Sequence, residues 1–258
     1  MQAFVLLKLS PDTVDELTVA ADGKSLETEA LRFKLGDSDE HALEQALLLK
    51  EKYGGTVTAV ALEALEVDDV LFTALAKGAD RAVKLSGEFT GSQSHAAAGA
   101  MGSFLQSGDA ALPADALILL RSQAIDDLDG EIGPFLADLL GVPYVGGVTG
   151  VAVAGEGLLV TKEFAGGLRG EFTLPLPAVL GIQSAEKPPR YVPIAKVRAA
   201  MKSGRMETAE IPLPATPASF TVERMYKPQA AGRAEMLEGA PEIVADRLVA
   251  VLAKNNLI

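Results

Sequence analysis

The 258-residue chain has no cysteine, no tryptophan and only two histidines, His41 and His95. Without cysteine there is no disulfide framework, no thiol nucleophile and no thiolate metal site. The two histidines are far apart in the sequence and lack metal-ligand spacing, so no metal site is predicted. Aromatic residues make up 5% of the chain, which leaves little for stacking on nucleic-acid bases.

Basic charge and long apolar runs are also scarce. The net charge of −12 argues against binding nucleic acid or an anionic membrane surface, and it is compatible with a cytoplasmic protein. The longest apolar runs, such as 110–120, are interrupted and far shorter than a membrane span. Residues 1–8 lack the basic lead-in and cleavage site of a signal peptide, so they are interpreted as a first strand.

Short apolar runs alternate with helical patterns over the first 140 residues. Strands are predicted at 3–7, 56–61, 81–85 and 117–120. Apolar residues at helical spacing predict helices at 40–53, 67–77, 94–106 and 135–140. Such alternation implies an α/β fold with a doubly wound, mostly parallel sheet.

The pattern changes after residue 140. Residues 142–161 alternate, are rich in Val and Gly, and turn at 154–157, and the pattern continues to residue 180. We expect added antiparallel strands that pack on the parallel sheet or extend it.

The last part of the chain has a different character. Residues 188–193 are extended, 194–202 form a short basic amphipathic helix, 207–230 have little periodicity and 241–253 form a last helix. An unstructured stretch of that length suggests an arm that wraps a partner subunit. The predicted division is therefore an α/β core domain at 1–186 and a partner-facing unit at 187–258.

One corner of the predicted sheet resembles a ligand site. The strand at 117–120 ends in a polar loop, and Pro134 opens the next helix, which is where open parallel sheets bind ligands. Amides at a helix start suit an anion. The side chains of this loop do not, because it carries Asp126, Asp127, Asp129 and Glu131. The alternative is an ordinary acidic loop whose carboxylates favour the helix N-terminus.

Several segments, taken in order, carry a family resemblance. They are Lys8-Leu-Ser-Pro-Asp-Thr13, 39–46 with 49–52, Ala74-Leu-Ala-Lys-Gly-Ala-Asp-Arg-Ala82, Gln123-Ala-Ile-Asp126, Glu163 with Gly166-Gly167, Leu174-Pro-Leu-Pro-Ala-Val179 and Pro189-Arg-Tyr191. Together they span roughly residues 4–258, and they resemble the β-subunit of electron-transfer flavoproteins. The fold that this resemblance implies is an adenine-nucleotide-binding-like α/β core with a C-terminal arm that embraces the partner.

The resemblance also implies a function. The α-subunit of the heterodimer holds the redox-active FAD, and the β-subunit supplies a docking surface without catalytic residues of its own. Acyl-CoA or related flavin dehydrogenases reduce the flavin, and a membrane quinone oxidoreductase takes the electrons. The expected location is the cytoplasm of a bacterium or archaeon, or the mitochondrial matrix of a eukaryote.

Two groups of residues correspond to partner-facing positions of the family. Ile194 falls at the position of the family's anchor leucine, which lies in a loop that recognises the dehydrogenase. The residues that correspond to this recognition loop are Arg190, Tyr191, Pro193, Ile194, Lys196 and Val197. An exposed apolar residue beside a basic helix also makes a plausible hot spot, while the alternative is a loop hydrophobe tucked into its own core. Glu163 and Thr13 fall near the partner-bound FAD, although Glu163 can equally be a solvated strand-end charge. The family's lysine cluster is thinned here to Lys202-Ser-Gly-Arg205.

The family's nucleotide site is altered almost throughout. β-subunits ordinarily bind AMP, or a second FAD in electron-bifurcating members. The matching positions here are Leu6, Gly36, Glu63, Arg121, Gln123, Ala124, Ile125, Asp126, Asp129, Gly130, Glu131, Ile132 and Gly133. A phosphate near Asp129 and Glu131 would meet two like charges, at a cost on the order of a few kcal/mol.

Large side chains would also fill the volume of the adenosine. Leu6, Glu63 and Arg121 replace smaller residues, and Arg121 can pair with Asp126, Asp129 or Glu63. We therefore predict a degenerate site without AMP or a second FAD, and no bifurcation. The alternative is that Arg121 contacts the phosphate from a new direction, since arginine binds phosphate well.

Two other functional classes remain open. One is an adenine-nucleotide hydrolase or ligase on the same type of sheet, and the other is a stress-protein-like nucleotide-binding module. An enzyme of the first class needs a Gly-rich, Ser/Thr-bearing or basic phosphate loop, which this sequence lacks. The arm after residue 187 has no purpose in the second class.

Overall fold

The computed structural model describes residues 1–87, 89, 94–107, 112–203, 206–211, 221–227, 232 and 234–258. Residues 212–220 and 228–230 of the predicted arm, and Gly204-Arg205 of the thinned basic cluster, lie outside the described residues.

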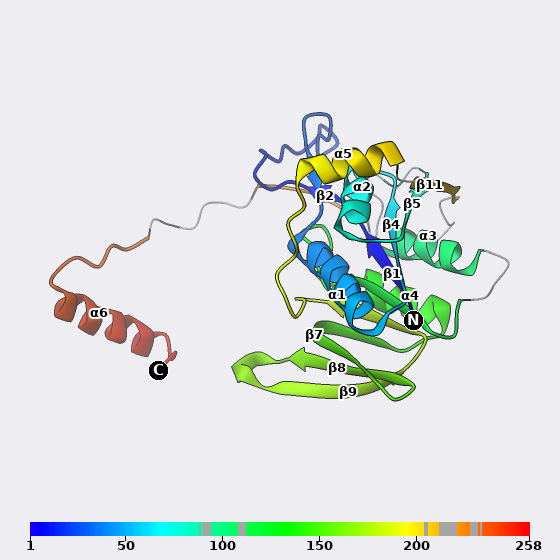
Figure 1. Cartoon of the computed structure of the whole chain (residues 1–258). Helices are drawn as coiled ribbons and strands as arrows, with labels where there is room; N and C mark the ends of the chain where they lie inside the picture. Colours follow the sequence, from blue (N-terminus) through cyan, green and yellow to red (C-terminus); the bar gives the residue numbers. More distant parts are fainter. Residues whose placement is uncertain are drawn as a thin grey trace.

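A nine-stranded sheet runs through the body in the order β11-β5-β4-β1-β6-β10-β7-β8-β9 (Figure 1). The strands from β11 to β7 are parallel, and β8 and β9 are antiparallel. The bounds are β1 Gln2–Leu7, β4 Thr56–Leu62, β5 Arg81–Ser86, β6 Ala116–Arg121, β7 Tyr144–Ala154, β8 Gly157–Glu163, β9 Arg169–Pro175, β10 Ala178–Ile182 and β11 Met206–Glu210. The predicted α/β class with a mostly parallel sheet is confirmed.

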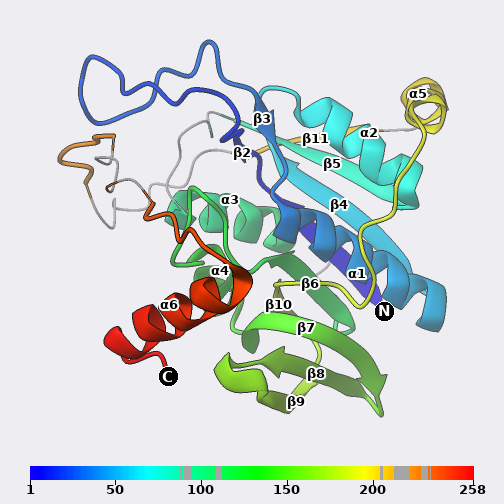
Figure 2. The ribbon, with the colours of Figure 1, turned by 90° about the vertical axis from the view of Figure 1, so that its left-hand side faces the viewer.

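Helices cover both faces of the sheet (Figure 2). α1 (Asp37–Tyr53) and α2 (Val67–Lys77) lie on one face, and α3 (Ser94–Gln106) and α4 (Ile132–Leu140) lie on the other. Because alternate residues of a strand point to opposite faces, β6 contributes to two cores. Leu117 and Leu119 belong to the core under α1, while Ile118 and Leu120 belong to the core under α3 and α4. Burial on both sides explains why the strand is a continuous apolar run.

β10 corrects one expectation. Residues 142–180 were expected to be antiparallel throughout, and β7, β8 and β9 follow that pattern with the predicted turn at 154–157. β10 instead pairs in parallel with both β6 and β7. All five of its residues are buried, so it lacks the alternation that marks a half-exposed antiparallel strand.

β11 corrects a second expectation from the sequence. The sequence interpretation assigned residues 207–210 to the arm, but they form an edge strand parallel to β5. The strand Met-Glu-Thr-Ala-Glu carries two carboxylates, as is common for edge strands, and its pattern therefore does not resemble a core strand.

The remaining elements sit on the periphery. β2 (Ser10–Pro11) pairs with β3 (Phe33–Lys34), and the predicted hairpin around 21–24 closes with a bridge between Val19 and Leu26. A 3₁₀ turn, η1, spans Ala165–Gly167. Part of the arm lies on this hairpin, where the Met225 N–H donates to the Gly23 carbonyl at 2.7 Å.

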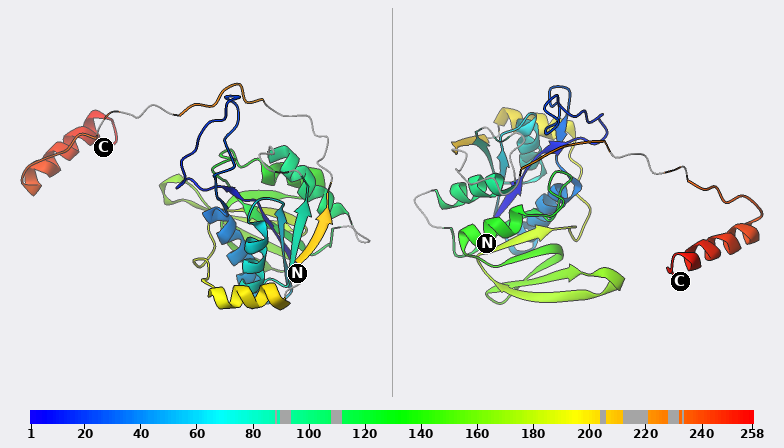
Figure 3. Two further views of the ribbon diagram at one scale, coloured as in Figure 1. Left: turned by 90° about the horizontal axis from the view of Figure 1, so that it is seen from above. Right: turned by 180° about the vertical axis from the view of Figure 1, so that it is seen from behind.

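The last two helices differ in their contacts. α5 (Ile194–Ser203) packs against α2. α6 (Pro241–Lys254) stands apart from the sheet, and all of its residues are exposed or half-exposed (Figures 1 and 3). Among the described residues, no helix combines the length and apolar character needed to cross a membrane.

Candidate functional site

Arg121 lies at the carboxyl end of β6, where the sequence analysis expected a ligand. Its Nη1 donates to the Lys8 carbonyl at 2.9 Å and lies 3.5 Å from Oδ2 of Asp39, and its Nη2 donates to Oδ1 of Asp126 at 3.0 Å. The side chain of Arg121 is 2% exposed and that of Asp39 is fully buried. One guanidinium therefore ties together the end of β1, the first turn of α1 and the loop after β6.

Burial dominates the electrostatics of this cluster. It raises the pKa of the Asp39 carboxyl to about 6, although the charge of Arg121 and the N–H groups of Gly36 and Lys8 act in the opposite direction. The Lys8 ammonium also pairs with Asp126. Arg121 and Lys8 thus bind acceptors of the chain itself, although Oδ1 of Asp39 and Nε of Arg121 have no hydrogen-bond partner among the described residues.

The loop between β6 and α4 is closed by its own atoms. Oδ1 of Asp127 accepts the Glu131 N–H at 3.1 Å, at the start of α4. Gly130 has φ +67°, and a Cβ there would lie 2.3 Å from the Ser122 carbonyl oxygen, so only glycine fits this turn. The carboxylate of Asp127 therefore lies beside the start of α4, where a helix N-terminus attracts an anion.

Tyr144 fills the space between α4 and the sheet, and the sequence analysis did not find it. A Cβ added to Gly133, Gly146 or Gly181 would come within 3 Å of its ring or hydroxyl. Burial raises the pKa of the Tyr144 phenol. The three surrounding glycines were the only available signal, and they lie too far apart in the sequence to form a motif.

The other predicted site residues are placed separately. Leu6 is buried in the core under α3 and α4. Glu63 accepts hydrogen bonds from the Gly87 N–H at 2.9 Å and the Ser86 hydroxyl at 3.0 Å, which lower its pKa. Of the three carboxylates suggested as partners of Arg121, Asp126 pairs with it, whereas Glu63 binds Ser86 and Gly87.

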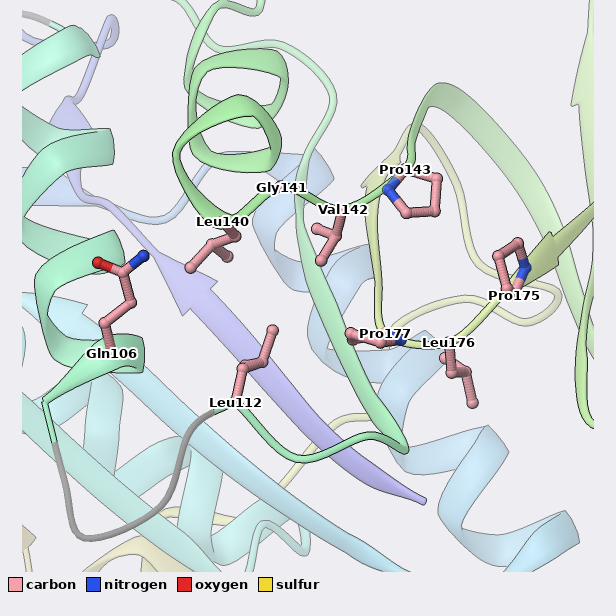
Figure 4. A pocket seen from close by; sticks show the side chains of 9 residues that line it. All are labelled: Gln106, Leu112, Leu140, Gly141, Val142, Pro143, Pro175, Leu176 and Pro177. Atoms are coloured by element: carbon pink, nitrogen blue, oxygen red, sulfur yellow. The ribbon is translucent and has the colours of Figure 1, made fainter.

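These features do not fit a nucleotide phosphate. The guanidinium of Arg121 is directed at acceptors of its own chain, and Asp127 stands at the start of α4. A hollow of about 550 Å³ does exist, but it lies among Leu112, Val142 and Pro177, which precede β6, β7 and β10 (Figure 4). That is the amino end of the strands, whereas sheets of this kind bind ligands at the carboxyl end.

A second region of interest is the segment between β10 and α5. Ile194 is 66% exposed and Tyr191 is 87% exposed, so neither packs into the core of the chain. Lys196 and Lys202 are exposed beside them, and Val197 is half-buried. Arg190, which was also expected to face a partner, binds Glu44 and Glu51 of α1 through its guanidinium and is 30% exposed.

The two residues expected near a partner's flavin lie on separate parts of the fold. Glu163 ends β8 and pairs with Arg169 at 2.9 Å, with both side chains well exposed. Thr13 is exposed in the loop after β2. Next to it, a hydrogen bond from Lys34 is the main cause that lowers the pKa of Asp12.

A model of the electron transfer flavoprotein domain matches residues 25–216. The chain belongs to the electron transfer flavoprotein family. It is 29% identical to the electron transfer flavoprotein subunit beta of Bacillus subtilis, over 98% of this chain and 97% of that protein. The subunit beta of Clostridium acetobutylicum is 32% identical, over 81% of this chain and 79% of that protein.

A third relative has a more specific name. The acryloyl-CoA reductase electron transfer subunit gamma of Anaerotignum propionicum is 30% identical, over 65% of this chain and 62% of that protein. The matches to subunits named beta identify the chain as an electron transfer flavoprotein β-subunit, and the family as one of heterodimeric flavoproteins that transfer electrons.

Proposed function

We propose that this β-subunit docks acyl-CoA or related flavin dehydrogenases and supports an α-subunit that holds FAD, so that electrons pass to a quinone oxidoreductase. FAD supplies the redox chemistry, and this chain supplies surfaces. The observation that carries the proposal is the exposed pair Tyr191 and Ile194 beside the basic helix α5. An apolar anchor with a charged surround is a common form of interaction hot spot.

The unit at 187–258 is proposed to pack on the α-subunit through its last helix. α6 presents Ile243, Leu248, Val249 and Val251 to solvent, each 42–53% exposed. A helix with that much exposed apolar surface is expected to be covered by another chain. Glu163 and Thr13 are proposed to lie near the flavin of the α-subunit.

The β nucleotide site is proposed to be degenerate, without AMP or a second FAD, and the protein therefore non-bifurcating. The burial of Arg121 and the position of Asp127 support this proposal. An experimental density map with a nucleotide among Leu6, Glu63 and residues 121–133 would contradict it. Retained AMP, bound through Arg121, is the alternative form of the same function.

The remaining alternatives have less support. The described loop offers carboxylates where a nucleotide hydrolase needs groups that donate hydrogen bonds to a phosphate. In a stand-alone nucleotide-binding module, the exposed helix α6 has no explanation. The cytoplasm, or the mitochondrial matrix in a eukaryote, stays a prediction for the location.

Co-expression with the α-subunit of the same genome tests the proposed function. We expect an equimolar heterodimer with bound FAD that an acyl-CoA dehydrogenase reduces in the presence of its substrate. Ile194→Ala should raise the KM for the heterodimer about tenfold or more with little change in kcat, since it removes a docking anchor. A chain that does not join the α-subunit, or an unchanged KM in Ile194→Ala, would contradict the proposal.

A further inference from the structure

The chain between β10 and α5 has no regular secondary structure, yet its first half is firmly held. It passes beside α1 before it reaches α5 (Figure 2). Backbone N–H groups in this stretch donate to the body of the protein: Gln183 to the Val148 carbonyl at 2.9 Å, Ala185 to Nδ1 of His41 at 3.1 Å and Glu186 to Oε1 of Gln45 at 3.1 Å. Two of these three acceptors are side chains of α1.

Arg190 is the last held residue before the exposed pair. The carboxylate of Glu44 accepts from its backbone N–H at 3.0 Å, from Nε at 2.9 Å and from Nη2 at 2.8 Å. Nη1 donates to Glu51 at 2.6 Å. The side chain of Glu44 is 4% exposed and that of Arg190 is 30% exposed, so this fork is partly shielded from solvent. Glu44 and then Glu51 raise the pKa of Arg190.

The chain beyond Arg190 is fixed again after three residues. α5 begins at Ile194, where the Lys196 N–H donates to the Pro193 carbonyl at 2.8 Å, and the helix packs on α2. The exposed residues Tyr191 and Pro193 thus lie on a short bridge between two anchored points. Such a bridge has few conformations open to it.

We propose that Arg190 is a positioning residue, whose fork on Glu44 holds Tyr191 and Ile194 in their docking arrangement before a dehydrogenase arrives. The inference rests on the proposed function, in which these two residues dock. A segment that is ordered in advance does not lose its conformational freedom on binding, and that loss weakens affinity by about tenfold for even a few residues.

A direct contact between Arg190 and the partner is the competing role. The guanidinium would then have to leave Glu44, and a carboxylate that is 4% exposed would lose its cation. Breaking a shielded charge pair in this way is unfavourable. The geometry therefore favours positioning over contact.

Glu44→Gln in the heterodimer separates the two roles, because Glu44 is too buried to touch a partner. If Arg190 positions the segment, this variant should raise the KM for the heterodimer about tenfold in the acyl-CoA dehydrogenase assay, with kcat unchanged. Arg190→Lys, which keeps the charge but loses the fork, should fall between wild type and Arg190→Gln. If Arg190 contacts the partner, Glu44→Gln frees it and leaves the KM unchanged or lower, which would overturn the proposal.

Lys50→Gln is the matched control, since Lys50 lies on the same helix and pairs with Asp80 away from the segment. Hydrogen exchange supplies a readout without a dehydrogenase. The hydrogen-bonded amides of Glu186, Arg190 and Lys196 should exchange about tenfold faster in Glu44→Gln and Arg190→Gln than in Lys50→Gln. If exchange and KM in Glu44→Gln and Arg190→Gln match those in Lys50→Gln, the positioning role of Arg190 is refuted. If Ile194→Ala does not raise the KM, the proposed docking site is wrong, and the exchange rates still decide whether Arg190 positions the segment.

Discussion

Arg121 and Arg190 both bind carboxylates of α1, and they do so in opposite ways. Arg121 is 2% exposed and meets Asp39 at 3.5 Å; among the described residues, Oδ1 of Asp39 and Nε of Arg121 have no hydrogen-bond partner. Arg190 is 30% exposed and directs Nε and both terminal nitrogens at Glu44 and Glu51. The deeper pair is the less completely bonded one.

The difference shows that burial and pairing act separately on a charge. Desolvation outweighs pairing at Asp39 and raises its pKa, whereas the hydrogen bond from Arg190 outweighs desolvation at Glu51 and lowers its pKa. A buried pair is expensive to form and more expensive to break. A half-exposed fork contributes less stability but fixes geometry.

The largest effect should come from breaking the buried pair. Arg121→Ala leaves Asp39 buried without a cation, so we expect a loss of about 3–5 kcal/mol in the free energy of unfolding. Urea denaturation of the heterodimer measures it, with Arg81→Ala, which breaks an exposed pair with Glu207, as the control. Asp39→Asn added to Arg121→Ala should recover part of the loss. A loss no larger than that of the control would show that the pair is not a buried charge pair.

The next largest effect should be the contribution of the raised pKa of Asp39 to the pH dependence of stability. Its pKa rises from 3.8 to about 6 on folding, so the folded state binds more protons between these values and stability falls as the pH rises through them. About two pKa units correspond to at most roughly 3 kcal/mol. The stability of wild type minus that of Asp39→Asn should therefore decrease from pH 4 to pH 6.5 and then level off. A difference that stays flat or increases with pH would contradict the pKa shift.

The fork on α1 should matter less to stability. Glu44→Gln removes a buried charge that accepts hydrogen bonds from three groups of the partly exposed Arg190, so we expect a loss of about 1–2 kcal/mol. Arg190→Gln should cost a similar amount, and the double variant little more, because both remove the same interaction. Thermal or urea unfolding of the four proteins completes this cycle. Fully additive losses would mean that the two residues do not act as a pair.

The smallest effect is expected at the exposed pair of Glu163 and Arg169. Arg169→Gln should cost less than about 1 kcal/mol, because solvent screens the charges. The cost should vanish in 1 M salt. A loss as large as that of Glu44→Gln would undo the distinction between exposed and shielded pairs.

Local pattern predicted local structure well in this chain. The predicted helices at 67–77 and 94–106 match α2 and α3, because apolar spacing reports which face is buried. β10 was expected to be antiparallel, because a strand's neighbours are chosen by tertiary packing that leaves no local trace. β11 was assigned to the arm, because its two carboxylates hide the pattern of a strand.

The same limit applies to the site. The pair of Arg121 with Asp126, five residues apart, could be suggested from the sequence. The bonds from Arg121 to Lys8 and from Arg190 to Glu44 span 113 and 146 residues, and no sequence pattern connects them. A contact between residues close in the sequence could therefore be suggested in advance, whereas the contacts across more than a hundred residues required the fold.

Acid release of nucleotides from the co-expressed heterodimer, resolved by chromatography and quantified per dimer, tests the proposed protein-filled β site most directly. We predict one FAD and no AMP, because a site filled by Arg121 and its partners would leave no room for the nucleotide. One FAD with one AMP would mean that Arg121 binds phosphate, and two FAD would restore bifurcation; either result would contradict the account.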